Sequence, residues 1–527
     1  MEGDGGLRDM ASTLEKIKWY KKVYGTCKTC RYLKNKVLYG YMDDYPRWQK
    51  KHAISEAELE EQRATHFEKE PLISIVVPLY KTPVQYLGAL VESVKAQTYL
   101  NWELCLSDGS GKSEADNDAG GAVQPPLRAM LGHLQGADSR IRVVTSDTPL
   151  GISDNTNQAL SIAKGEYIAF ADHDDLLAPN ALYENVKVIN EHPDVQFIYS
   201  DEDKVDGAGK RCFMPHFKPD FNLEMLRSTN YFCHLCVVSR ELYEKIGGLI
   251  ADYDGAQDYD FVLRCVEQIS DKEKIRHIPK ILYHWRAYVA STAESADRKD
   301  YANDAGIKAL KVHYDRLGIK ADIEPVEKGG IEYPGMYRTR YQVVGDPKVT
   351  VIKGNKQSEE QVGDYILFLN EDAEPISKDL AQEMLSYCMQ PDVGAVSAKV
   401  YGTNGCIVYA GGFLREDGSV CNAFTGFMHD DPGYFGRAII AQDVNVASDE
   451  CVMIKAELLD VDEINQEDLA VVCRKIRENG KRIVFDPFAE VDYKGNLTAH
   501  TRAQSVIKDP YYNPNLVSER AVFDLGR

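Results

Sequence analysis

The sequence contains no long hydrophobic run. Across its 527 residues, no stretch approaches the roughly 18 consecutive apolar residues of a membrane-spanning helix, and the pattern of a secretory signal peptide is missing from its start. Basic residues are also scarce, since 62 Lys and Arg stand against 82 Asp and Glu. The net charge of −20 argues against a protein that binds nucleic acid, which needs a basic face. An anionic ligand stays compatible with this charge, because a divalent cation can reverse the local field.

Cysteine is too sparse for a disulfide scaffold. The chain has 12 cysteines, and some lie in apolar, strand-like runs, as Cys105 does in WELCLSDGS. This usage is typical of a reducing cytoplasm, where thiols serve as small core residues. Two pairs, Cys27/Cys30 and Cys233/Cys236, have the spacing of zinc ligands. The second pair lies in the apolar segment YFCHLCVV, which favours a strand over a zinc site.

Strand-like and helix-like segments alternate from residue 71 onward. Apolar strands are expected at LISIVVPLY, WELCLSDGS and RIRVVTSD. Amphipathic helices are expected over 83–99 and 151–165. Such alternation predicts an α/β fold with a mainly parallel sheet and helices on both faces.

An acidic cluster closes the next buried strand. The run GEYIAFADHDD, residues 165–175, ends in Asp172, His173, Asp174 and Asp175. In open α/β sheets, ligands bind at the edge where parallel strands end. Carboxylates crowded there repel one another unless a cation joins them. The cluster therefore indicates a metal site, with a solvated acidic turn as the alternative.

A second copy of this pattern follows in the C-terminal part of the chain. GDYILFLNEDAEPISKDL at residues 363–380 repeats GEYIAFADHDDLLAPNAL at residues 165–182, and CVMIKAEL repeats CVVSREL. The segment before the acidic turn is much shorter in the second copy, from Ile352 to Asn370, than between Pro78 and Asp172 in the first. We therefore expect the second copy to bind no nucleotide.

The ordered motifs ISIVVPLYKTP, LSDGS, GISDNTNQAL, GEYIAFADHDD and GAQDYDFVLR resemble those of family 2 glycosyltransferases. The tandem arrangement, with DDPGYFGR and DPYYNPNL, resembles bacterial enzymes of O-antigen or rhamnose-rich cell-wall polysaccharide synthesis. The resemblance implies an A-type glycosyltransferase fold, an α/β fold with a Rossmann-like, mainly parallel sheet, followed by a degenerate second copy. It divides the chain into a basic and aromatic helical lead-in and linker (1–69), a catalytic domain (70–320), a linker (321–346) and a second domain (347–527).

The resemblance also implies roles for individual residues. The donor is expected to be held by Pro78, Tyr80, Asp108, Gly109, Asn155 and Asp172. Mg²⁺ or Mn²⁺ is expected to be bound by Asp172, Asp174 and His284, and Asp258 is expected to be the catalytic base. The alternatives are a turn-forming Asp108, a structural His284, and an Asp258 that caps a helix or joins Asp252 and Asp254 in a calcium site. In the second copy, Asp468 and Asp492 align with Asp258 and His284.

The resulting hypothesis is an inverting glycosyltransferase. It would move a sugar from a UDP- or dTDP-sugar to a growing surface or cell-wall polysaccharide, free or lipid-linked, by metal-assisted single displacement. A non-catalytic glycan-binding subunit and a sugar nucleotidyltransferase are the alternatives, although PLYKTPVQY is not the Gly-rich phosphate loop that the latter would favour. A cytoplasmic protein is expected, with the basic and aromatic residues 12–41 touching anionic lipid at the inner face of the cell membrane.

Overall fold

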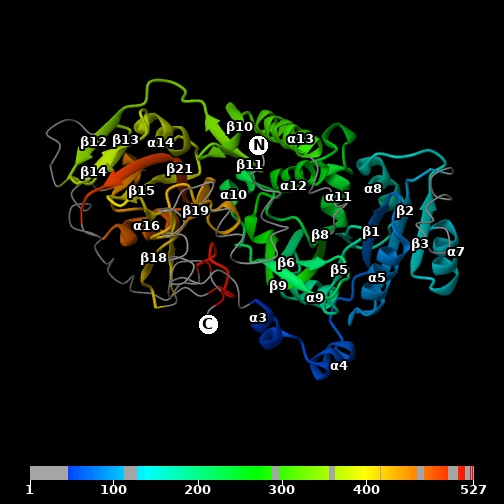
Figure 1. Ribbon diagram of the computed structural model, residues 1–527. Coiled ribbons are helices and arrows are strands. Elements are labelled where there is room, and N and C mark those ends of the chain that lie inside the picture. The colour runs from blue at the N-terminus through cyan, green and yellow to red at the C-terminus, as the bar shows by residue number, and fades with distance from the viewer. Residues whose placement is uncertain are drawn as a thin grey trace, which may run out of the picture.

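The computed structural model describes most of the chain as two α/β units that lie side by side (Figure 1). The described residues are 45–111, 127–287, 296–354, 363–415, 417–459, 468–495, 509–516, 523 and 525. The basic segment 12–41 and the pair Cys27/Cys30 lie outside these residues, so their predicted roles stay predictions. Among the helices that are described, none is long and apolar enough to span a membrane.

The first unit is built on a nine-stranded sheet. The strand order is β3-β2-β1-β4-β8-β6-β9-β5, with β7 paired to β6. The strands are β1 (Ile73–Leu79), β2 (Trp102–Asp108), β3 (Ile141–Thr145), β4 (Tyr167–Phe170), β5 (Leu176–Leu177), β6 (Phe197–Asp206), β7 (Cys212–His216), β8 (Cys236–Ser239) and β9 (Ile275–Ala287). Strands β1 to β4 are parallel to one another, while β8 runs antiparallel between β4 and β6. The predicted α/β fold with a mainly parallel sheet is confirmed.

Helices cover both faces of this sheet (Figure 1). They are α5 (Val84–Lys95), α7 (Leu127–Ala137), α8 (Ile152–Ser161), α9 (Ala181–Glu191), α10 (Leu223–Ser228), α11 (Arg240–Ile246), α12 (Gln257–Gln268) and α13 (Ala296–Leu317), with the 3₁₀ turns η1 (Ala251–Tyr253) and η2 (Lys272–Lys274). In β1, Ile75 and Val77 pack with α5, α7 and α9, whereas Val76 packs with α8 and α12. The continuous apolar run ISIVV follows from this, because the strand is buried on both faces.

Among the described residues, two short helices precede the sheet, and a hairpin follows it. Helices α3 (Tyr45–His52) and α4 (Glu56–Ala64) lead into β1, and α4 starts with a capping box formed by Ser55 and Glu58. Residues 321–346, expected as a linker, contain the antiparallel hairpin of β10 (Ala321–Lys328) and β11 (Ile331–Tyr341). Tyr337 and Tyr341 of β11 are buried in the core, so the segment between the units is itself well packed.

The second unit has a sheet of the same order with two strands fewer at one edge. Its order is β12-β13-β20-β15-β21-β14, with β16 and β19 paired at the side and β17-β18 as a separate pair. The strands are β12 (Val349–Lys353), β13 (Tyr365–Leu369), β14 (Ala373–Pro375), β15 (Val393–Gly402), β16 (Ile407–Tyr409), β17 (Gly412–Leu414), β18 (Val420–Asn422), β19 (Gln442–Val444), β20 (Cys451–Lys455) and β21 (Arg482–Tyr493). Pair by pair, the strand directions match those of β1-β4-β8-β6-β9-β5. Counterparts of β2 and β3 are missing from the described part of this sheet.

The described part of the second unit has few helices and a broad contact with the first unit. Its described helices are α14 (Leu380–Cys388) and α16 (Leu469–Glu478), with the 3₁₀ turns η3 (Tyr434–Gly436) and η4 (Ala456–Leu458). The Tyr434 hydroxyl donates a hydrogen bond to the carbonyl of Pro215 (2.7 Å) and accepts one from the amide of Phe217 (2.8 Å). Phe435 stacks on His216 at 3.9 Å between ring centroids. The Gly- and aromatic-rich run around η3 therefore packs against the first unit.

Candidate active site

The ends of β1 and β2 form one side of the candidate site. Leu79, the last residue of β1, is in register with Asp108, the last residue of β2. The amide of Gly109 donates to the carbonyl of Leu79 at 3.0 Å, which closes the turn. Tyr80 is 44% exposed beside it, and Pro78 is partly buried. The structure thus places four of the expected donor-binding residues at the carboxyl edge of the sheet.

Asp108 is fully buried at this edge. Its Oδ1 accepts a hydrogen bond from the amide of Ser110 (3.0 Å), and its Oδ2 lies 3.4 Å from Nε of Arg128 on α7. Arg128 was not singled out in the sequence, because nothing in its local pattern indicates that α7 returns to the end of β2. The carboxylate is therefore fixed in direction by a turn and a cation.

Asn155, in the first turn of α8, holds the two strand ends together. Its side-chain amide donates to the carbonyl of Leu79 (2.8 Å), and its Oδ1 accepts from the Ser107 hydroxyl (2.6 Å). A Cβ on Gly109 would lie 2.6 Å from Asn155 Cγ, so only glycine fits there. Both polar ends of this buried side chain are used inside the protein. Asn155 therefore holds the two strand ends in position. Its side chain is not free to contact the nucleotide-sugar donor, as we had expected it to do.

The acidic turn separates one buried carboxylate from two accessible ones. Asp175 is fully buried and accepts hydrogen bonds from the Tyr283 hydroxyl (2.6 Å) and the Arg286 amide (2.7 Å). Burial, together with the charges of Asp172 and Asp174, raises the pKa of Asp175 well above its usual range. The Asp172 side chain is 47% exposed, and Oδ1 of the less exposed Asp174 lies 3.1 Å from Nδ1 of His173.

His234, which no motif in the sequence indicated, lies beside the acidic turn. Its Nε2 lies 3.5 Å from Oδ2 of Asp172, and its ring stacks on Tyr283 at 4.6 Å. One ligand atom each from Asp172, Asp175 and His234 lies within 4.8 Å of the others, a spacing that could hold a metal ion. The residue lies just before β8, which pairs with β4, and this pairing brings it to the acidic turn.

His284 belongs to a different group of side chains. Its Nδ1 lies 2.6 Å from Oδ1 of Asp203 and 3.8 Å from the Cys212 sulfur. Burial alone would lower the pKa of His284, but the hydrogen bonds and charges of Asp203 and Cys212 together outweigh burial and raise the pKa to about 10. Neighbouring side chains of a strand point to opposite faces, so Tyr283 reaches the acidic turn while His284 turns away. The structure therefore does not unite His284 with Asp172 as we expected.

Asp258 lies at the start of α12 beside the acidic turn. Its Oδ2 accepts a hydrogen bond from the side-chain amide of Asn230 at 2.9 Å. The side chain of Asp258 reaches solvent, yet the surrounding protein partly desolvates the carboxylate and raises its pKa. The charge of His234 opposes this increase in pKa, and the charge of Asp172 adds to it. Asp254 is instead held by Ser153 through two hydrogen bonds, so the described residues show no calcium cluster around Asp258.

Comparison with known proteins identifies a family 2 glycosyltransferase domain in this chain. The sequence model described as glycosyl transferase family 2 matches residues 74–247. An uncharacterized protein, y4gI, of Sinorhizobium fredii is 33% identical over 550 residues, covering 86% of this chain and 59% of that protein. The O-antigen biosynthesis protein RfbC of Myxococcus xanthus is 27% identical over 561 residues, covering 90% of this chain and 42% of that protein.

This chain thus spans about half the length of these relatives. Among solved structures, the mannosyltransferase PcManGT of Pyrobaculum calidifontis in complex with GDP-Man and Mn²⁺ is 16% identical with a TM-score of 0.32, covering 50% of this chain and 80% of that one. The matched model shows that the first α/β unit contains a family 2 glycosyltransferase domain over residues 74–247.

Proposed function

We propose that the first α/β unit transfers a sugar from a nucleoside-diphosphate donor to a polysaccharide acceptor. The observation that carries this proposal is the grouping of Asp258 and Asp172 around His234, next to the ends of β1 and β2. A base, a set of oxygen ligands and a nucleotide-facing sheet edge are the parts that single displacement of a sugar requires. O-antigen biosynthesis, the role in the name of the Myxococcus relative, supports a surface polysaccharide as acceptor.

The donor's nucleoside would lie on the ends of β1 and β2. Tyr80 offers an exposed ring beside Pro78, on which a base can stack. Asp108 is buried, but its Oδ2 accepts no hydrogen bond among the described residues, so this oxygen could accept one from a uracil or thymine N3–H or from a ribose hydroxyl. Both UDP- and dTDP-sugars satisfy this chemistry.

A divalent cation, Mg²⁺ or Mn²⁺, would be held at the acidic turn. Asp172 has oxygen atoms open to solvent, and Asp174 lies two residues further along the same turn. Asp175 already accepts two hydrogen bonds, which suits it to holding the turn, while His234 adds a nitrogen atom close to Asp172. Carboxylate oxygens with one imidazole fit such an ion. When bound, the ion would neutralise charge that develops on the leaving diphosphate.

Asp258 would take the proton from the attacking acceptor hydroxyl. A carboxylate with a raised pKa is a better proton acceptor near neutral pH than an ordinary aspartate. Asn230 fixes one of its oxygens, which leaves the other for the acceptor. With one base and no enzymic nucleophile, direct displacement inverts the anomeric centre. The acceptor, free or lipid-linked, and membrane contact through residues 12–41 belong to the same proposal.

A screen of nucleotide sugars with the whole chain tests this function. UDP- and dTDP-sugars are added with and without Mn²⁺, and the free energy of unfolding is followed. A true donor at 100 times its dissociation constant should add about 2.7 kcal/mol. Asp172→Asn should remove the Mn²⁺-dependent part of that gain, while Asn370→Asp, at the aligned position of the second unit, should change nothing. Stabilisation by none of these donors would refute the proposal.

A further inference from the structure

The C-terminal segment 509–516 connects the second unit to the first. At its start it is anchored in the second unit, where Oδ2 of Asp509 accepts a hydrogen bond from the amide of Leu414 at 2.7 Å. Tyr512 stacks on Phe413 at 4.1 Å between ring centroids. The next residue, Asn513, is 1% exposed and lies inside the first unit. The segment is thus fixed at both ends.

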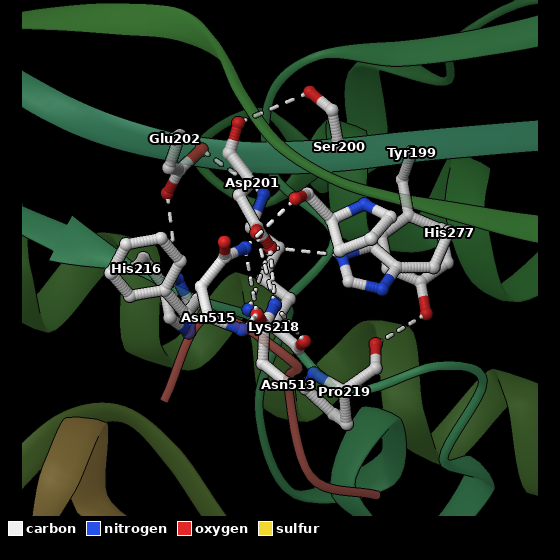
Figure 2. A network of polar contacts seen from close by, with 12 residues as sticks. Tyr199, Ser200, Asp201, Glu202, His216, Lys218, Pro219, His277, Asn513 and Asn515 are labelled. Carbon is white, nitrogen blue, oxygen red and sulfur yellow. Dashed lines mark hydrogen bonds and ion pairs between the residues drawn. The ribbon is translucent and has the colours of Figure 1, made fainter. Parts of the chain in front are cut away.

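Figure 2 shows the buried polar network that Asn513 joins. The side-chain amide of Asn513 donates to both carboxylate oxygens of Asp201 (3.1 and 2.9 Å) and to the carbonyl of Lys218 (2.8 Å). Asp201 also accepts from the amide of Lys218 (2.8 Å) and lies 2.8 Å from Nε2 of His277. Both backbone polar groups of Lys218 are therefore held, one by Asp201 and the other by Asn513.

Lys218 in turn holds the loop before β8. Its buried ammonium group donates to the carbonyls of Phe232 and His234, both at 2.7 Å, and lies 3.3 Å from Oε2 of Glu202. The same oxygen of Glu202 accepts the amide hydrogen of His234 at 3.1 Å. One buried ion pair consequently fixes both the N–H and the C=O of His234.

We infer that Asn513 is a positioning residue for the active site of the first unit. It acts through Lys218 on His234, whose imidazole contacts Asp172 and influences Asp258. Inside a protein, a polar network that loses one donor rearranges, because unpaired polar groups are costly in a medium of low dielectric constant. The inference rests on the proposed function of this site. It implies that the second unit helps to position active-site residues of the first unit.

The test compares two neighbouring substitutions in the full-length chain. Asn513→Ala removes the amide, whereas Pro514→Ala changes an exposed residue of the same segment. The ring Cε1–H resonance of His234, assigned by its loss in His234→Gln, is followed by NMR. We expect Asn513→Ala to move this resonance and Pro514→Ala to leave it in place. Donor hydrolysis should fall about 10- to 100-fold in Asn513→Ala, which is the usual effect of losing a residue that orients a metal ligand, with the donor KM nearly unchanged.

Asn513→Gln keeps the inference testable if Asn513→Ala does not fold. Its amide is displaced by one methylene, so it should fold and show a smaller shift of the His234 resonance in the same direction. A His234 resonance that stays at the wild-type position in every folded variant at Asn513 would overturn the inference. If the wild-type chain binds no nucleotide sugar, the proposed function fails, yet the resonance still decides whether Asn513 positions His234.

Discussion

Arg482, in the second unit, should stabilise the first unit. It lies at the start of β21, and its Nη1 contacts Asp443 at 2.5 Å and Glu224 of the first unit at 3.3 Å, while its Nε contacts Asp392 at 2.8 Å. Glu224 and Asp443 are each 1% exposed, so Arg482→Met would leave two buried carboxylates without this cation. Breaking a buried ion pair costs about 3–5 kcal/mol.

The lower end of that range applies here, because Glu224 keeps other partners. The Tyr341 hydroxyl donates to it at 2.6 Å, and Nη1 of Arg227 lies 3.6 Å away. Asp392 is 47% exposed, and an exposed pair of this kind adds at most about 1 kcal/mol. We therefore expect Arg482→Met to lower the free energy of unfolding by about 3 kcal/mol.

Tryptophan fluorescence during urea unfolding measures this effect selectively. All four tryptophans, at positions 19, 48, 102 and 285, precede the second unit. The tryptophan transition therefore reports on the first unit, although the substitution lies in the second. Arg474→Met is the control, because Arg474 pairs with the exposed Glu478 at 3.8 Å within the described part of the chain, and losing this pair should cost less than about 0.5 kcal/mol. An unchanged tryptophan transition in Arg482→Met would show that the units are energetically independent and refute this reasoning.

Two further predictions concern the acidic turn and the partly buried His284. Asp174→Ala should abolish metal-dependent donor turnover and Mn²⁺ binding in a titration. The variant should keep its fold, because the substitution removes a charge that repels Asp175. Asp372→Ala, at the aligned position of the second unit, should change neither donor turnover nor Mn²⁺ binding. The pKa of His284 is raised to about 10 against about 6.5 in an unfolded chain, so its pair with Asp203 stabilises the fold fully below about pH 6.5 and is lost as the pH rises through about 10. In urea unfolding, the free energy of unfolding should fall less for His284→Asn than for the wild type as the pH rises between these two values.

The sequence predicted the sheet because its signals are local. Ile75, Val76 and Val77 form a continuous apolar run, which only a strand covered on both faces requires, and the structure buries all three. The motifs at the strand ends follow from the same rule, because parallel strands deliver their carboxyl ends to one edge. Pro78 and Asp108 were therefore expected near each other, and they lie there.

Side-chain direction and long-range pairing were beyond such signals. Asn155, in a helix's first turn, could have faced a ligand or the strand ends, and only the packed structure shows that it holds Leu79. His234 reaches the acidic turn through the pairing of β8 with β4, which no local pattern encodes. The contact between Glu224 and Arg482 joins residues 258 positions apart, and isolated charges carry no information about their partners.

Transfer by the full-length Asp258→Asn variant tests the central claim most directly. Asparagine keeps the shape of the side chain and its contact with Asn230 but cannot take a proton at neutral pH. Donor hydrolysis and donor affinity are measured side by side, with Asp468→Asn at the aligned helix start of the second unit as control. The account predicts turnover lower by about 10²- to 10⁴-fold, with donor affinity and the control unchanged. Near-normal turnover, or loss of donor binding together with turnover, would contradict the assignment of Asp258 as the base.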